Sequence, residues 1–205
     1  MKKAYFFDLD GTLADTDRDI REAWKAAMAD LGLECADFDE RFVAGPPIDV
    51  MLQQLFPGEY TPELASRMRE AFGRHYDHDG FPNTREYPGI LAKVRELKLR
   101  GARVFIATNK RHAGASIMAR KFGWDEVFEK LYTGDMYGVK KPELLSIILK
   151  EQRLDPADCA MVGDTANDFA AAKANGLEAV GVTWGYGTPE ELKTATRTIE
   201  RPEEI

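Results

Sequence analysis

The chain has 205 residues, of which 44% are hydrophobic and 31% are charged, and its net charge is −7. This length fits one large domain, or a core domain with a smaller insertion, and the hydrophobic share is enough for a sizeable core. The negative net charge disfavours a nucleic acid as partner. The most basic stretch, residues 93–103, has apolar residues at helical spacing and no aromatic stacking platform, which indicates a solvated helix face.

Apolar runs and cysteines predict a cytoplasmic location without membrane attachment. The longest apolar runs are far shorter than a membrane span. The first residues, Met1-Lys2-Lys3, lead into a strand pattern and not into the apolar region and cleavage site of a signal peptide. Cys35 and Cys159 are far apart and lack CxxC spacing, so we expect plain thiols in a reduced compartment.

Strand and helix patterns alternate over most of the chain. In chain order, strand-like runs occur at 4–8, 102–107, 159–162 and 179–182, with a weaker one at 130–132. Helical patterns lie between them, at about 88–100, 112–122, 142–152 and 165–175. This alternation predicts an α/β fold with a Rossmann-like parallel sheet and helices on both faces.

Residues 15–83 break the alternation. Asp17–Leu31, Pro47–Leu55 and Thr61–Tyr76 have the pattern of consecutive amphipathic helices, with no convincing strand between them. We therefore predict a helical domain of residues 15–83, inserted after the first strand of a core formed by residues 1–14 and 84–205.

Two carboxylates follow the first strand pattern. Residues two apart in an extended segment point to the same side, so Asp8 and Asp10 are expected side by side at the strand's carboxyl end, where open α/β sheets bind ligands. Adjacent carboxylates raise each other's pKa, and a divalent cation would relieve the conflict. One carboxylate could bond covalently to phosphorus while the other transfers protons. The alternative is an acidic turn that ends a strand.

Two later segments carry groups suited to binding phosphate. The second core strand ends in Thr108-Asn109-Lys110, where a hydroxyl and the backbone N–H groups that follow it could hold a phosphate oxygen, although a plain turn is the alternative. Lys141 precedes Pro142, which fits the first position of a helix, and its charge could neutralise a phosphate. An exposed pair of lysines, Lys140 and Lys141, is the alternative there.

A further acidic pair follows the strand pattern at 159–162. Asp164 comes directly after Gly163, and Asp168 lies four residues later in the first turn of the next predicted helix. Either acid alone could be a helix cap or a favourable first-turn charge.

In this order, these patterns resemble the four motifs of the haloacid dehalogenase-like (HAD) hydrolase superfamily, and the resemblance covers residues 4–190. It implies that Asp8 is a nucleophile and Asp10 a general acid and base. It further implies that Thr108, Asn109 and Lys141 hold phosphate, and that Asp8, Asp10 through its backbone carbonyl, Asp164 and Asp168 hold Mg²⁺, a hard cation suited to oxygen ligands. Whether Asp168 ligates the ion or supports Lys141 stays open. Leu144 stands where the family often has a second proline.

The insertion resembles the helical cap of HAD phosphatases. Its segment Ala44-Gly45-Pro46-Pro47 is similar to a cap loop of phosphoglycolate phosphatase and nucleotidase relatives, and Arg41 just before it could meet an anionic substrate. A plain helix break and restart is the alternative for this segment. His75, Asp77, His78 and Asp79 could be zinc ligands, but a solvated helix end is the usual meaning of such a cluster.

The resemblance implies a Mg²⁺-dependent phosphatase of small phosphomonoesters that works through an aspartyl-phosphate. Its partner would be a small phosphorylated metabolite such as phosphoglycolate, and the protein would be a monomer or homodimer. Alternatives are a 5′-nucleotidase or pyrophosphatase of the same superfamily, a sugar-phosphate mutase, and a HAD-like binding module without activity. Asp10 argues against haloacid dehalogenation, and the complete motif set argues against an inactive module. The motifs do not identify the physiological substrate.

Overall fold

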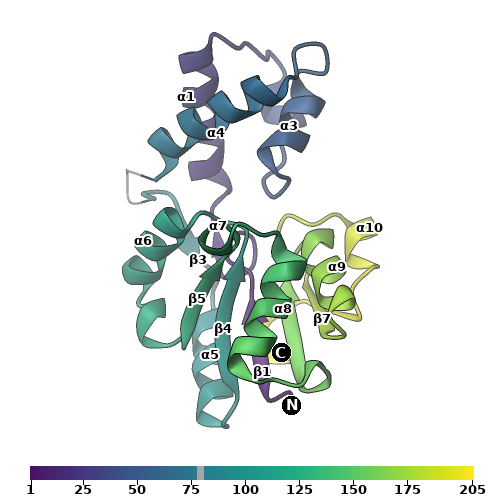
Figure 1. Cartoon of the computed structure of the whole chain (residues 1–205). Helices are drawn as coiled ribbons and strands as arrows, with labels where there is room; N and C mark the ends of the chain where they lie inside the picture. The colour runs from purple at the N-terminus through teal and green to yellow at the C-terminus, as the bar shows by residue number, and fades with distance from the viewer. Residues whose placement is uncertain (78–80) are drawn as a thin grey trace. The chain divides into compact units, whose positions relative to one another are not determined.

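The computed structural model of the chain describes residues 1–77 and 81–205, which form two compact units (Figure 1). One unit consists of Met1–Asp15 and Arg85–Ile205, and the other of Thr16–Thr84. The second unit is therefore one continuous segment that interrupts the sequence of the first.

A six-stranded sheet forms the centre of the first unit. Its order is β5-β4-β1-β6-β7-β8, and all neighbouring strands are parallel. The strands are β1 (Ala4–Phe7), β4 (Arg103–Thr108), β5 (Lys130–Thr133), β6 (Cys159–Gly163), β7 (Glu178–Val182) and β8 (Arg197–Ile199). The predicted Rossmann-like parallel sheet is confirmed. The sequence pattern did not predict β8, because this edge strand is short and carries two polar residues.

Helices cover both faces of this sheet (Figure 1). On one face, α8 (Lys141–Gln152) and α9 (Ala166–Ala174) pack on buried residues of alternate strand positions, among them Phe6 and Phe105. The opposite face is covered by α5 (Ile90–Leu99), while α6 (His112–Phe122) packs near the β5 edge. Phe7 points away from Phe6 and contacts Phe128, with ring centroids 5.7 Å apart. Strands buried on both faces explain why their sequence runs are continuously apolar.

Short elements complete the first unit. The antiparallel pair β2 (Ala14–Asp15) and β3 (Arg85–Glu86) lies where the chain leaves and re-enters this unit. The others are α7 (Gly134–Tyr137), α10 (Pro189–Leu192) and the 3₁₀ turns Trp124–Glu126, Pro156–Asp158 and Pro202–Glu204.

The regular secondary structure of the second unit consists of helices joined by loops in its described residues. It contains α1 (Asp17–Leu31), α2 (Phe38–Arg41), α3 (Ile48–Leu55) and α4 (Pro62–Tyr76). The long helices α1 and α4 pack together, and Trp24 of α1 lies 6.3 Å from Phe72 of α4 between ring centroids. Asp19 joins the two ends of the unit, because its carboxylate accepts hydrogen bonds from the backbone N–H groups of Asn83 and Thr84. No helix among the described residues is long and apolar enough to cross a membrane.

Candidate active site

The carboxyl ends of three adjacent strands bring several motif residues to one end of the sheet. Asp8 directly follows β1, Thr108 is the last residue of β4, and Asp164 directly follows β6. Because β1 pairs in parallel with both β4 and β6, these three positions lie at the same end of the sheet. This end is where open α/β sheets bind ligands.

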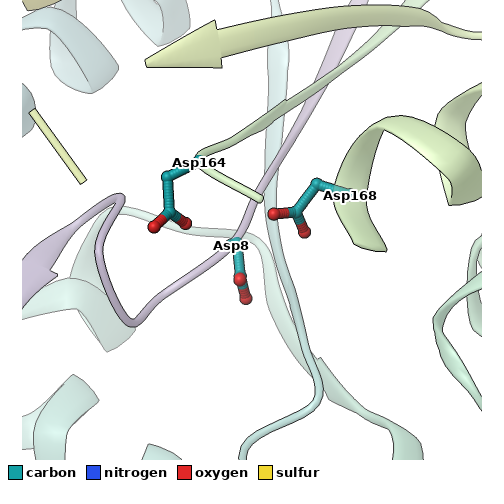
Figure 2. Close-up of side chains that lie close together, drawn as sticks. All are labelled: Asp8, Asp164 and Asp168. Atoms are coloured by element: carbon teal, nitrogen blue, oxygen red, sulfur yellow. The ribbon is translucent and has the colours of Figure 1, made fainter. Parts of the chain in front are cut away.

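Three carboxylates form a compact cluster there. Asp8, Asp164 and Asp168 each offer one oxygen, and the three oxygens lie within 4.8 Å of one another. Figure 2 shows the side chains arriving from the segment after β1, the segment after β6 and the first turn of α9. Asp164 and Asp168 are fully buried, whereas the Asp8 side chain is 13% exposed. Such a set of oxygen donors is suited to a metal ion.

Burial and mutual repulsion oppose ionisation of this cluster. Burial raises the pKa of Asp164 well above its ordinary value, and the charges of Asp168 and Asp8 raise it further. Burial also raises the pKa of Asp168, while Lys141 opposes the shift and Asp8 adds to it. A cation bound between these groups would offset the repulsion.

Lys141 is a buried cation within the site. It is the first residue of α8, and Pro142 is the second, so the helix begins one residue earlier than the sequence predicted. Its Nζ lies 2.5 Å from Asp168 Oδ1 and 3.0 Å from Asp8 Oδ1. Burial alone lowers the pKa of Lys141, but the charges of Asp168 and Asp8 outweigh burial and raise the pKa above its ordinary value. Lys141 is therefore charged throughout the neutral pH range.

The carboxylates of the cluster differ in their protein partners. Asp168 Oδ1 accepts from Lys141, and its Oδ2 accepts from the N–H and hydroxyl of Thr165 at 3.1 and 3.0 Å, as the capping box of α9. Asp164 forms no ion pair within the described part of the chain. Asp8 Oδ1 is buried without a hydrogen-bond partner among the same residues, so its contact with Lys141 is an ion pair. Asp168 thus has the shorter ion pair with Lys141 and a hydrogen-bond partner on each oxygen, whereas Asp164 has no ion pair in the described residues and Asp8 has one oxygen without a hydrogen bond; Asp8 and Asp164 are therefore better placed to ligate a cation.

A loop after β7, which includes residues 184–187, contacts Asp164. The sequence analysis predicted Asp164 but did not predict a role for this loop. The Tyr186 N–H donates to Asp164 Oδ2 at 2.8 Å, and the Thr12 hydroxyl donates to Oδ1 at 3.1 Å. A Cβ at Gly185 would collide with the Asp164 side chain, and one at Gly187 would overlap the Asp164 carbonyl oxygen. The available signal was the Gly-Tyr-Gly sequence shortly after a strand, since glycine permits close backbone approach.

Asp10 lies outside the three-carboxylate cluster and has a different cationic partner. β1 ends at Phe7, so the strand geometry behind the expected side-by-side placement of Asp8 and Asp10 does not apply to them. Asp10 instead forms an isolated bridge with Ala14. The Nζ of Lys110 lies 3.0 and 3.3 Å from the two Asp10 carboxylate oxygens. The sequence analysis included Lys110 in the strand-end segment but gave its side chain no role.

Thr108 and Asn109 form the turn after β4. The buried Thr108 hydroxyl oxygen accepts a hydrogen bond from the Lys110 N–H at 3.2 Å. Its hydroxyl proton remains available to a ligand oxygen. Asn109 is exposed in this turn.

The site contains more acidic than basic groups. Its ionised form combines the carboxylates of Asp8, Asp10, Asp164 and Asp168 with the ammonium groups of Lys110 and Lys141. The excess of two negative charges equals the charge of one divalent cation. The charge balance therefore fits a metal such as Mg²⁺, which binds with few carboxylates.

The candidate substrate residues Arg41 and Gly45 lie in the second unit. The Arg41 guanidinium donates to the Asp37 carboxylate at 3.3 Å and to the Gln54 carbonyl oxygen. Its side chain is 39% exposed, so further guanidinium N–H groups can reach a ligand. Gly45 has a φ of 119°, a conformation that favours glycine.

The zinc alternative receives no support from the described residues. His75 Nε2 lies 2.9 Å from Asp30 Oδ2, an exposed contact between two helices of the second unit. Its predicted co-ligands His78 and Asp79 lie outside the described residues. The described ranges contain one metal-ligating group of three acids, histidines or cysteines, the cluster of Asp8, Asp164 and Asp168.

Sequence comparison identifies the family to which the chain belongs. Residues 5–182 match the family model of haloacid dehalogenase-like hydrolases. Because the match spans most of the chain, the protein belongs to the haloacid dehalogenase-like hydrolase family, as the motifs indicated.

Individual relatives resemble the chain over nearly its whole length. A 5′-nucleotidase of Pseudomonas aeruginosa is 31% identical over 192 residues, covering 91% of this chain and 85% of that protein. A phosphoglycolate phosphatase of Neisseria gonorrhoeae is 33% identical over 211 residues, covering 99% of this chain and 88% of that protein. The crystal structure of a predicted phosphatase from Clostridium acetobutylicum matches with a TM-score of 0.89 and 25% identity, covering 100% of this chain and 96% of that one.

Proposed function

We propose that the protein is a Mg²⁺-dependent phosphatase of small phosphomonoesters that works through an aspartyl-phosphate on Asp8. The observation that carries this proposal is the contact of Asp8 with the buried ammonium of Lys141, beside Asp164 and Asp168, at the carboxyl end of the central strand. A nucleophilic carboxylate next to a fixed cation and a metal-binding cluster is what phosphoryl transfer requires.

Mg²⁺ is the metal that the donor chemistry favours. Asp8 and Asp164 would hold it through their carboxylates, and Asp10 through its backbone carbonyl. Asp168, already engaged by Lys141 and Thr165, would orient the lysine and not ligate the metal. A bound Mg²⁺ would offset charge on the phosphate oxygens.

In the first step, a carboxylate oxygen of Asp8 bonds to phosphorus while the bond from phosphorus to the leaving oxygen breaks. The leaving oxygen takes a proton from the Asp10 carboxyl and departs as an alcohol. The Lys141 ammonium and the Thr108 hydroxyl stabilise the charge on the phosphoryl oxygens.

In the second step, water attacks the phosphorus of the aspartyl-phosphate. Asp10, now a carboxylate, takes a proton from this water, and the bond between phosphorus and Asp8 breaks. Inorganic phosphate leaves, and the Asp8 carboxylate is restored.

We infer that the second unit selects the leaving group, because the core residues named above address only phosphate and metal. A phosphoglycolate-like substrate is supported by the relative from N. gonorrhoeae, and a nucleotide by the relative from P. aeruginosa. Arg41 and the segment around Gly45 are the candidate contacts for an anionic leaving group.

A substrate panel tests the proposal. The panel contains phosphoglycolate, nucleoside monophosphates, sugar phosphates and pyrophosphate. Purified protein with Mg²⁺ should release phosphate from at least one of the phosphomonoesters, and chelation should abolish the release. Asp8→Asn should lower turnover more than about 100-fold, equivalent to more than about 2.7 kcal/mol of barrier, because the near-isosteric amide is not a nucleophile. The matched control is Asp155→Asn, which alters an acid outside the site.

Retention of more than about a tenth of wild-type turnover in Asp8→Asn would contradict the nucleophile assignment. Release from pyrophosphate alone, or phosphate transfer between sugar hydroxyls, would favour a pyrophosphatase or a mutase. No turnover on any compound would favour a binding module.

A further inference from the structure

Lys110 is a buried cation that the proposed reaction does not use. Its side chain is 4% exposed, and its Nζ lies 3.0 and 3.3 Å from the two carboxylate oxygens of Asp10. Its backbone N–H donates to the Thr108 hydroxyl oxygen at 3.2 Å. The turn after β4 therefore fixes the point from which this lysine reaches Asp10.

Burial of this lysine is unusual for its position. A lysine in a turn normally keeps its ammonium group in water, and burying it is unfavourable unless it is paired. Asp10 lies in the segment after β1, where backbone hydrogen bonds such as Gly11 N–H to the Ala14 carbonyl oxygen hold the main chain. These bonds do not involve the Asp10 carboxyl group, whose orientation depends on its own partners, and Lys110 contacts both of its oxygens.

We propose that Lys110 is a positioning residue that orients Asp10 for protonation of the leaving group. This inference rests on the proposed phosphatase function. When the Asp8 oxygen bonds to phosphorus and the leaving oxygen departs, the Asp10 proton moves to that oxygen and a carboxylate remains. The Lys110 ammonium restricts rotation of the Asp10 carboxyl group and stabilises the negative charge that develops on it.

The test compares two leaving groups in single turnovers with enzyme in excess. An alkyl phosphate requires protonation of its leaving oxygen, whereas p-nitrophenyl phosphate releases a stabilised phenolate that needs little help. Rapid quenching follows release of the alcohol or p-nitrophenol, so later hydrolysis of the aspartyl-phosphate does not limit the rate. Lys110→Met should slow release from the best alkyl substrate of the panel about 10- to 100-fold, and p-nitrophenol release less than about threefold.

Two variants separate positioning from a general loss of structure. Lys110→Arg should restore most of the alkyl rate, because a guanidinium can contact both carboxylate oxygens. Lys140→Met removes an exposed lysine close in sequence to Lys141, with the same change in net charge, and should leave both rates unchanged. Removing one partner of a buried ion pair can destabilise a protein, so Lys110→Gln, which keeps one donor, replaces the Met variant if that variant does not fold.

Equal slowing of both substrates in Lys110→Met, or no slowing of either, would overturn the positioning role. A wild-type protein that releases neither product would instead overturn the phosphatase proposal, and this inference with it.

Discussion

The position of Asp164 suits a metal ligand, but it is unfavourable for an ionised carboxylate when no metal is bound. It is fully buried, and it lies close to two other carboxylates without an ion pair of its own in the described residues. Two neutral donors, the Tyr186 N–H and the Thr12 hydroxyl, hold it in place. This arrangement would suit a bound cation, and without one the buried carboxylates cost stability.

Asp164→Asn should stabilise the metal-free protein at neutral pH. Folding raises the pKa of Asp164 above its ordinary value of 3.8, mainly through burial, so the native state retains a proton that the unfolded chain has lost. The free energy of unfolding therefore falls as pH rises above 3.8 toward the raised pKa. Asparagine does not ionise, so the variant avoids this decrease in the free energy of unfolding. The decrease is about 1.4 kcal/mol for each unit by which folding raises the pKa.

Thermal unfolding with a chelator, from acidic to neutral pH, measures this effect. The difference in Tm between Asp164→Asn and wild type should grow with pH, by about 2–4 °C for each kcal/mol. Mg²⁺ should raise the Tm of the wild type and not that of the variant. A variant that is less stable than wild type at neutral pH without metal would contradict this account of Asp164.

Among the elements, the loop after β7 has the most specific fit to the site. Its two glycines allow the backbone to pass directly against Asp164, where a Cβ at either position would collide. Trp184 in the same loop donates to the Thr12 carbonyl oxygen at 3.2 Å, which anchors the loop to the segment after β1. The loop thus links two segments that present carboxylates.

Gly187→Ala should weaken Mg²⁺ binding. The new Cβ would overlap the Asp164 carbonyl oxygen, so the loop must shift and the Tyr186 N–H must leave Asp164. Losing a group that orients a ligand typically lowers metal affinity about 10- to 100-fold. Isothermal titration with Mg²⁺ measures the change.

Gly58→Ala is the matched control, because a Cβ at Gly58 has no neighbour within 4 Å and should leave Mg²⁺ affinity unchanged. Wild-type affinity in Gly187→Ala would mean that the loop does not orient Asp164 for the metal.

At the scale of the whole molecule, the chain forms two units, one built around a parallel sheet and one built from helices. Residues 1–15 and 85–205 contain the sheet and every group of the candidate site described above except Arg41 and Gly45. Residues 16–84 form a separate helical unit with its own aromatic packing. We therefore assign chemistry to the first unit and choice of leaving group to the second, as a proposal.

Arg41→Ala should lower kcat/KM for phosphoglycolate by about 10- to 150-fold, because a charge-assisted hydrogen bond to the substrate carboxylate contributes about 1.5–3 kcal/mol. p-Nitrophenyl phosphate has no carboxylate, so its kcat/KM should hardly change. Steady-state kinetics on both substrates measure the selectivity.

Arg67→Ala removes another exposed arginine of the second unit and should affect neither substrate. Equal losses on both substrates in Arg41→Ala would assign Arg41 a structural role through Asp37 and Gln54, with which it already forms hydrogen bonds.

Local signals in the sequence were sufficient for the fold and for the positions of most candidate residues. Each of these signals involves only residues that are neighbours in the chain. They are the apolar run of β1 before Asp8, the strand that ends in Thr108, and the proline directly after Lys141. Parallel strands then bring their carboxyl ends together whatever their spacing in sequence, which is why the cluster of Asp8, Asp164 and Asp168 could be anticipated.

Only the tertiary structure decided which partners these residues have. Lys110 contacts Asp10 across 100 positions of the sequence, and Thr12 contacts Asp164 across 152. No local sequence pattern specifies either contact. Asp168 could have been a metal ligand or a support for Lys141 by sequence alone, and its hydrogen bonds depend on how α8 packs beside α9. Periodicity and turn chemistry act over a few residues, whereas side-chain pairing depends on packing of the whole sheet and its helices.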